Sequence, residues 1–147
     1  MKILNVFFIF FFMFLLVSCS STSYIKAKSP TGEGYYDSIL QQDMYEITFN
    51  GNSETSATKA YDFTLLRAAE ICIENGYKTF DIIKSENRSK TEVGSVPYGY
   101  YTTTLVYSAT YPKFILIIKC SKENNLTFIA EEIKTNLRKK YNIVDKE

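Results

Sequence analysis

The sequence predicts an α+β domain built as a two-layer sandwich, in which a four-stranded mixed sheet carries two helices on one face. Three observations favour this class: an alternating apolar segment over residues 44–50, two segments with helical periodicity, and stretches rich in strand-forming residues between those helices. The expected order is strand, helix, three strands, helix, and the domain is expected to span residues 34–147.

The first strand is expected over residues 44–50, because Tyr45, Ile47 and Phe49 alternate with more polar neighbours. The Asn-Gly-Asn-Ser stretch at residues 50–53 follows it. These residue types end a strand and cap the element that comes next.

The first helix is expected over residues 56–75, because apolar side chains recur there every three or four positions. The apolar stripe comprises Ala57, Tyr61, Leu65, Ala68 and Cys72. The charged side chains of the opposite side are Lys59, Arg67, Glu70 and Glu74. Gly76 suits the left-handed position that ends a helix, and strand-forming residues resume over 77–84. Such short links predict a right-handed crossover between two parallel strands.

Residues 85–97 are polar and charged, so they are expected to form an exposed loop. Two strands are expected after it, over residues 100–110 and 114–120, and the unbroken apolar run of the second favours an interior strand. A closing helix is expected beyond Asn124. Its apolar positions are Leu126, Ile129, Ala130, Ile133 and Leu137.

Residues 1–18 have the pattern of a signal peptide: Lys2, a Phe-rich apolar run, and the small residue Ser18 before Cys19. As a helix the apolar run would span about 22 Å, short of the roughly 30 Å hydrocarbon core, so a permanent transmembrane anchor is the weaker interpretation. The Leu-Val-Ser-Cys stretch that ends at Cys19 resembles the lipobox of bacterial lipoproteins. The resemblance implies that Cys19 takes up diacylglycerol, that the chain is cut before it, and that an N-acyl lipid follows. The alternative is an ordinary secretory leader with an incidental cysteine.

The same resemblance also predicts where the cleaved protein is located. In lipoproteins of double-membrane bacteria an Asp after the acylated cysteine commonly signals retention at the inner membrane, and Ser20 stands there instead. A periplasm-facing outer-membrane location is therefore favoured over the inner membrane. Residues 19–33 are rich in Ser, Thr, Lys, Pro and Gly, which predicts a flexible tether reaching about 20 Å. The mature chain would carry 16 basic and 16 acidic side chains, so nucleic acid is not an expected partner.

Three blocks of the chain resemble an uncharacterised group of bacterial envelope lipoproteins. The blocks are Tyr45-x-Ile47-x-Phe49-x-Gly51-Asn52, Asp62-x-x-Leu65-Leu66-Arg67-Ala68-Ala69-Glu70 and Gly76-Tyr77-x-x-Phe80. The similarity covers roughly a third of the chain, from Tyr35 to Ile83, and the Leu-Leu-Arg-Ala-Ala-Glu block is its most specific part. It implies a lipoprotein with a compact α+β domain, and it implies no substrate or mechanism.

The first candidate interaction set lies in the first helix and consists of Asp62, Arg67 and Glu70. Arg67 and Glu70 stand three residues apart, so a local ion pair on the surface is the simpler interpretation. The alternative is that the three side chains bind a ligand or a partner.

The second candidate set is the tyrosine-rich stretch with Tyr98, Tyr100 and Tyr101. Flat amphipathic rings stack on sugars or anchor protein contacts, and peptidoglycan is at hand in this compartment. The simpler interpretation is that tyrosine is a favoured strand residue.

No catalytic site and no metal site are expected. The chain has no histidine, which removes the usual general base and the commonest metal ligand. It has no Cys-x-x-Cys pair, phosphate-binding glycine loop or nucleophile elbow either. No cofactor is therefore expected beyond the lipid on Cys19. For Cys72 and Cys120 two interpretations stay open: a disulfide formed in an oxidising envelope, or free thiols that fill apolar space.

The sequence thus predicts a non-enzymatic, membrane-anchored envelope lipoprotein that acts through protein contacts or as a structural component. A wall-glycan or peptidoglycan binding module that uses the tyrosines is the alternative. A hydrolase built on carboxylates alone is the weakest candidate function.

Overall fold

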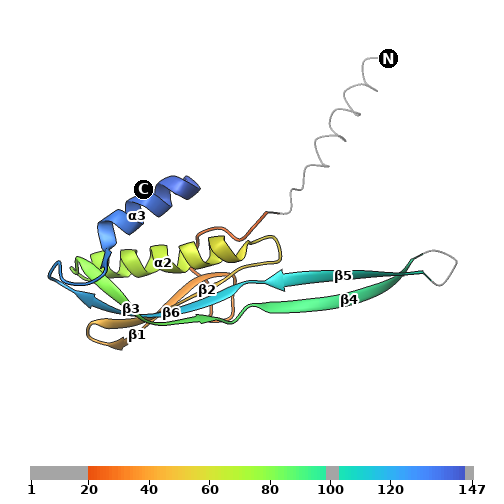
Figure 1. Ribbon diagram of the computed structural model, residues 1–147, viewed down its shortest axis with the longest axis horizontal. Coiled ribbons are helices and arrows are strands. Elements are labelled where there is room, and N and C mark those ends of the chain that lie inside the picture. The colour runs from red at the N-terminus through yellow and green to blue at the C-terminus, as the bar shows by residue number, and fades with distance from the viewer. Residues whose placement is uncertain (1–19, 99–102, 145–147) are drawn as a thin grey trace, which may run out of the picture.

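The computed structural model describes residues 20–98 and 103–144, which form an α+β domain with two helices and seven strands (Figure 1). The elements are β1 (Gly34–Gln41), β2 (Met44–Asn50), α2 (Ala57–Glu74), β3 (Thr79–Asn87), β4 (Lys90–Tyr98), β5 (Thr103–Tyr111), β6 (Lys113–Ser121), β7 (Phe128–Ile129) and α3 (Ala130–Tyr141). The predicted α+β class is confirmed. The predicted four-stranded mixed sheet is wrong, because the strands form a five-stranded sheet in the order β1-β2-β6-β3-β7 and a separate pair, β4-β5.

Neighbouring named strands are antiparallel throughout both sheets. Since β2 and β3 each pair with β6, the two run parallel to one another with β6 between them. The chain leaves the sheet along β3 and β4 and returns along β5 and β6. A return of that kind is antiparallel, whereas parallel neighbours need a crossover connection. The expected strand-helix-strand direction is therefore present, but its two strands are not neighbours.

β1 is a strand that the sequence analysis does not predict. It pairs with β2 along its whole length, from Gly34 opposite Asn50 to Gln41 opposite Met44. Its two large aliphatic residues, Ile39 and Leu40, are consecutive and both exposed, so no alternating apolar pattern marks the strand. An edge strand of this kind can be identified from its pairing with β2 in the structure, but not from its own sequence.

Residues 85–97 are strand except for positions 88 and 89, and not the expected loop, because β3 continues to Asn87 and β4 begins at Lys90. The pair β4-β5, called the arm below, extends beyond the body of the domain as a continuation of β3 and β6 (Figure 1). Nine residues of extended chain measure about 30 Å. Both faces of the arm meet solvent, so its sequence carries many polar residues and resembles that of a loop.

α2 lies at the centre of the domain. One side packs on β2 and β6, and the other is covered by α3, which stacks on α2 and not directly on the sheet (Figure 1). Every residue from Leu66 to Cys72 is buried, including charged residues expected on a solvated side. The predicted two-layer arrangement is therefore wrong in detail, since α3 adds a further layer. The largest fully buried aliphatic and aromatic side chains of the core are Ile47, Phe49, Leu66, Phe80, Leu116 and Ile118.

The residues expected to form a tether lie against the domain. In this N-terminal segment, residues 20–33, Thr22 and Ala27 are buried, and Tyr24 packs edge-on against Phe63 with ring centroids 5.3 Å apart. The amide of Ala27 donates to the Tyr35 carbonyl at 2.7 Å, and the amide of Tyr35 donates to the Ile25 carbonyl at 2.8 Å.

Gly34 is required where the N-terminal segment meets β1. Its φ is 108°, and a Cβ at this position would lie 2.3 Å from the Ile25 carbonyl oxygen. Any side chain would push the N-terminal segment away from β1. The segment thus contacts β1 through a position where only glycine fits.

Cys72 of α2 and Cys120 of β6 form a disulfide that links the helix layer to the middle strand of the sheet. The bond closes a loop with a sequence separation of 48 residues. In the chain-entropy description a loop of that length stabilises the fold by about 4 kcal/mol.

We expect Cys72→Ala combined with Cys120→Ala to lower the free energy of unfolding by about 4 kcal/mol, because the unfolded chain regains the freedom that the bond removes. Urea denaturation of the oxidised protein and of the double variant measures the difference. Alkylation without reductant, followed by mass spectrometry, should find neither thiol reactive in the parent protein. Modification of both thiols in the folded parent would contradict the disulfide.

Candidate functional site

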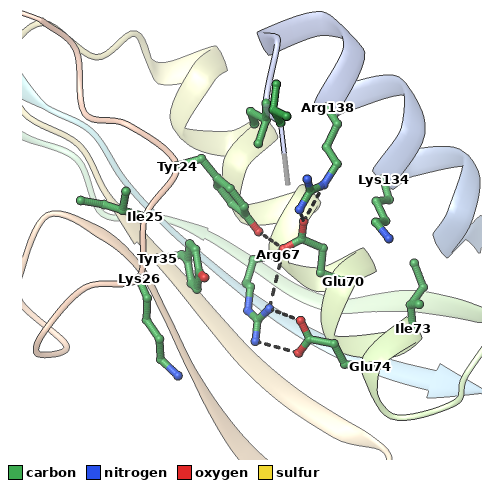
Figure 2. A pocket seen from close by; sticks show the side chains of 12 residues that line it. Tyr24, Ile25, Lys26, Tyr35, Arg67, Glu70, Ile73, Glu74, Lys134 and Arg138 are labelled. Carbon is green, nitrogen blue, oxygen red and sulfur yellow. Dashed lines mark hydrogen bonds and ion pairs between the residues drawn. The ribbon is translucent and has the colours of Figure 1, made fainter. Parts of the chain in front are cut away.

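A pocket of about 570 Å³ lies between the N-terminal segment, α2 and α3 (Figure 2). Tyr24 and Lys26 line it from the N-terminal segment, Arg67 and Glu70 from α2, and Lys134 from α3. The pocket therefore brings together the two most specific charged residues of the helical block and side chains from both ends of the described chain.

Glu70 is the centre of this arrangement, and 7% of its surface is exposed. Its Oε1 atom accepts two hydrogen bonds from Arg138 of α3, from Nε at 3.0 Å and from Nη2 at 2.6 Å. Its Oε2 atom accepts a hydrogen bond from the hydroxyl of Tyr24 (Figure 2). One buried carboxylate therefore joins α2 to α3 and to the N-terminal segment.

Arg67 makes the matching set of contacts on the other side of the pocket. Its Nη1 and Nη2 atoms donate to the two carboxylate oxygens of Glu74 at 2.7 and 3.1 Å, and its Nε atom donates to Asp37 of β1 at 2.9 Å. Its guanidinium carbon lies 5.0 Å from the centre of the Tyr35 ring. The nearest contact between Arg67 and Glu70 is an ion pair at 3.7 Å. The two residues predicted to pair on the surface are thus buried, and each binds other partners more closely.

The electrostatics of the pocket stabilise these ionised pairs. Burial acts to lower the pKa of Arg67, but its hydrogen bonds to Glu74 and Asp37 outweigh that effect and hold the pKa above its ordinary value. Burial, together with the charge of Glu70, raises the pKa of the Tyr24 hydroxyl. Tyr24 therefore stays protonated and donates to Glu70 across the pH range in which proteins usually work.

Asp62 does not join Arg67 and Glu70. Its Oδ2 atom accepts hydrogen bonds from Lys140 Nζ and from the Tyr141 hydroxyl, both at 2.6 Å. It therefore binds the last turn of α3 to α2 in a second, separate contact. Asp62 and Glu70 thus make two separate contacts between α2 and α3, whereas Arg67 joins α2 to β1.

Glu70 and Glu74 are the acidic residues among the described residues that line the pocket. Its two glutamates bind arginines, and no serine, threonine or cysteine is among the described residues that line it. Within residues 20–98 and 103–144, no group of three or more acidic or cysteine side chains is placed to hold a metal ion. In this setting Arg67 and Glu70 hold parts of the domain together: Arg67 binds α2 to β1, and Glu70 binds α2 to α3 and to the N-terminal segment.

The tyrosine set falls at the far end of the arm. Tyr98 is the last residue of β4 and pairs through its backbone with Thr103, while Tyr100 and Tyr101 lie outside the described residues. Two other tyrosines, Tyr107 and Tyr111, are exposed along β5.

Large apolar side chains are exposed on both faces of the arm. Residues directly opposite in an antiparallel pair share a face, which places Val93 on one face and Val96 with Leu105 on the other. The exposed fraction is 69% for Val93 and for Val106. A Cβ at Gly94 would lie 2.3 Å from the Tyr107 ring, so this glycine leaves room for that tyrosine to cross to β4. The arm thus presents aliphatic and aromatic surface that nothing in the described domain covers.

Sequence reasoning misses three partners of the buried network. Asp37 and Tyr24 precede Arg67 and Glu70 by 30 and 46 residues, and Arg138 follows Glu70 by 68. No spacing along the chain signals contacts over such separations. The nearest available signal is the clustering of charge on α2. Arg67, Glu70 and Glu74 share one face of the helix within about two turns.

We expect Glu70→Gln to lower the free energy of unfolding by about 3 kcal/mol, because it leaves the Arg138 charge without its carboxylate in a buried site. The matched control is Glu74→Gln, whose carboxylate is 55% exposed and should contribute less than about 1 kcal/mol. Urea denaturation of the two variants measures both values. Equal losses would contradict the central place given to Glu70.

Comparison of the chain with protein-family models, curated proteins and solved structures finds no match. The resemblance of the Leu65–Glu70 block to envelope lipoproteins therefore stays a prediction. Cys19 lies outside the described residues, and none of the helices described has the length and hydropathy to span a membrane.

Proposed function

We propose that the chain is a lipid-anchored protein of the bacterial cell envelope, without enzymatic activity, that uses its arm to bind an extended segment of another envelope protein. The arm carries this proposal. It is a two-stranded sheet that stands apart from the five-stranded sheet, with exposed apolar residues on both of its faces. The lipid anchor is proposed from the signal-peptide pattern that ends at Cys19.

The arm has the features of a surface that another chain completes. An isolated two-stranded sheet is marginally stable in water, and a further strand adds hydrogen bonds along its open edge. β4 and β5 pair with each other over nine residues and with no other described strand. Natural proteins protect exposed apolar edges, so an arm that displays Val93, Val106 and Leu105 is best explained by a partner that covers them.

A wall glycan is the second candidate ligand, and one observation favours it. Tyr107 and Tyr111 lie four residues apart on β5, so their rings share one face of the arm, and both are exposed. Aromatic rings on an open face suit the apolar face of a sugar. A wall glycan would bind the same arm as the proposed protein partner, so an experiment is needed to distinguish the two ligands.

We expect Cys19→Ala to abolish incorporation of a clickable fatty acid in cells, because the thiol that carries the lipid is lost. Gel fluorescence after labelling measures the incorporation. The control is Cys72→Ala with Cys120→Ala, which should keep the label. Labelling that persists in Cys19→Ala would overturn the lipid anchor.

We expect Val93→Glu with Val106→Glu to reduce crosslinking of the arm to envelope proteins at least tenfold, because two valines that contact the partner become charged. Both side chains are exposed in the free protein, so the fold should keep its melting temperature. Photo-crosslinking in intact cells from a probe at Leu105, read by mass spectrometry, measures the change.

The control for the arm variant is Lys119→Glu, which also introduces a charge change on an exposed strand position away from the arm. Unchanged crosslinking in the arm variant would contradict protein binding. Co-sedimentation with purified wall that is lost in Tyr107→Ala with Tyr111→Ala, or in Tyr100→Ala with Tyr101→Ala, would favour the glycan instead.

A further inference from the structure

We infer that the domain is seated directly on the bilayer through one defined surface, and that it does not swing on a tether. The partner of this surface is the lipid headgroup layer. The inference rests on the lipid anchor proposed for Cys19. The surface, called the anchor-proximal surface below, is formed by the exposed residues Ser20, Ser23, Ser53, Glu54, Ala57 and Thr58.

The first step is the fixed position of Thr22. Its amide donates to Thr55 Oγ1 at 2.9 Å and to Asn52 Oδ1 at 3.2 Å, and its hydroxyl donates to Glu33 at 3.0 Å. The Asn52 amide donates back to the Thr22 hydroxyl at 2.8 Å. Thr22 is 5% exposed, so this cluster of bonds is shielded from water. Thr22 is therefore part of the folded domain.

Neighbouring residues of the N-terminal segment are held in the same way. The Asn52 side chain donates to the Ser20 carbonyl at 2.9 Å, and Lys59 Nζ donates to the Ser21 hydroxyl at 2.6 Å. These contacts begin one residue after Cys19. The ordered chain thus reaches as far as the residue next to the proposed anchor.

The second step is the length of chain between anchor and domain. Three peptide units separate Cys19 from Thr22, and consecutive Cα atoms are about 3.8 Å apart, so the two residues can be at most about 11 Å apart. A flexible tether of about 15 residues would place the domain about 20 Å away on average and in any orientation. With Cys19 at the membrane interface, the anchor-proximal surface lies within reach of the headgroups, and the other surfaces do not all have that access.

The third step is the character of the surface itself. Its side chains are small hydroxyl-bearing residues, one alanine and a single acid, Glu54, with Lys59 beside it. Small side chains permit close approach of a flat surface, and a near-neutral patch is not repelled by anionic lipid. Residues 51–56 connect β2 to α2, at the end of the sheet where the Gly51 amide donates to the Pro112 carbonyl at 2.8 Å. The root of the arm therefore also lies beside the membrane.

The test uses the lipidated full-length protein in phosphatidylcholine vesicles that contain a headgroup spin-labelled lipid. Cys72 and Cys120 are bonded to each other and Cys19 is acylated, so an introduced cysteine is the single free thiol for a fluorophore. We expect the spin label to quench a fluorophore on Ser53→Cys at least threefold more than one on Lys119→Cys. Lys119 is the matched control because it is exposed, lies at the opposite end of β6 from Lys113, and alternates away from the buried Ile118 and Cys120 that face α2.

A release variant, Thr22→Val with Asn52→Ala, Thr55→Val and Lys59→Met, removes the side-chain hydrogen bonds that fix residues 20–22. We expect it to bring the two quenching values within a factor of about 1.5 while circular dichroism shows the fold retained. Equal quenching of the two labels in the parent protein would overturn the inference. So would a threefold difference that survives in the release variant.

Flotation of the vesicles separates this inference from the proposed function. Protein that floats with the lipid but shows equal quenching of the two labels would contradict the fixed orientation on the bilayer and would leave the lipid anchor intact. Protein from the native host that carries no lipid and does not float would overturn the anchor, and with it the inference.

Discussion

The buried carboxylate of Glu70 is the interaction on which the helical side of the domain depends. It receives hydrogen bonds from Arg138 of α3, which lies on α2 and not directly on the sheet, and from Tyr24 of the N-terminal segment, which reaches the sheet at β1. A buried charge is costly unless it is paired and hydrogen-bonded, so these elements cannot separate from α2 without exposing or orphaning it. Arg67 extends the same constraint to Asp37 of β1. The network therefore sets where both ends of the described chain lie.

What the sequence predicts well is local, and what it misses is long-range. The alternation of Tyr45, Ile47 and Phe49 identifies β2, and the apolar stripe through Cys72 identifies α2 within two residues at each end. β1 is not predicted, because its consecutive Ile39 and Leu40 do not form an alternating apolar pattern. Of the two strands of the arm, β5 agrees with the strand expected over residues 100–110, but β4 is missed, because a strand with both faces in solvent needs no apolar period either. The side of α2 that bears Arg67 looks solvated from its charges, yet it is covered by residues that lie 30 to 68 positions away.

The candidate site divides in the same way. Arg67 and Glu70 can be selected from the helical block, since two opposite charges on a helix next to small alanines mark a place of close approach. Their partners cannot be selected, because ion pairs across elements leave no spacing in the chain. The N-terminal segment is the largest difference from expectation. Its Ser, Thr, Gly and Pro composition is typical of a linker, but Thr22 uses its hydroxyl within the fold and Gly34 allows the backbone to approach Ile25. Composition alone therefore predicts the behaviour of such a segment in isolation, and it does not show whether the rest of the domain binds it.

The disulfide gives the arm a mechanical property. β5 passes through Pro112 straight into β6, and β6 is joined at Cys120 to Cys72 of α2. A pull on the tip of the arm is thus carried along covalent bonds into the central helix, and the strands of the body cannot peel away one hydrogen bond at a time beyond that crosslink. The oxidation state of two cysteines decides how much load the domain sustains before its helix layer separates from its sheet.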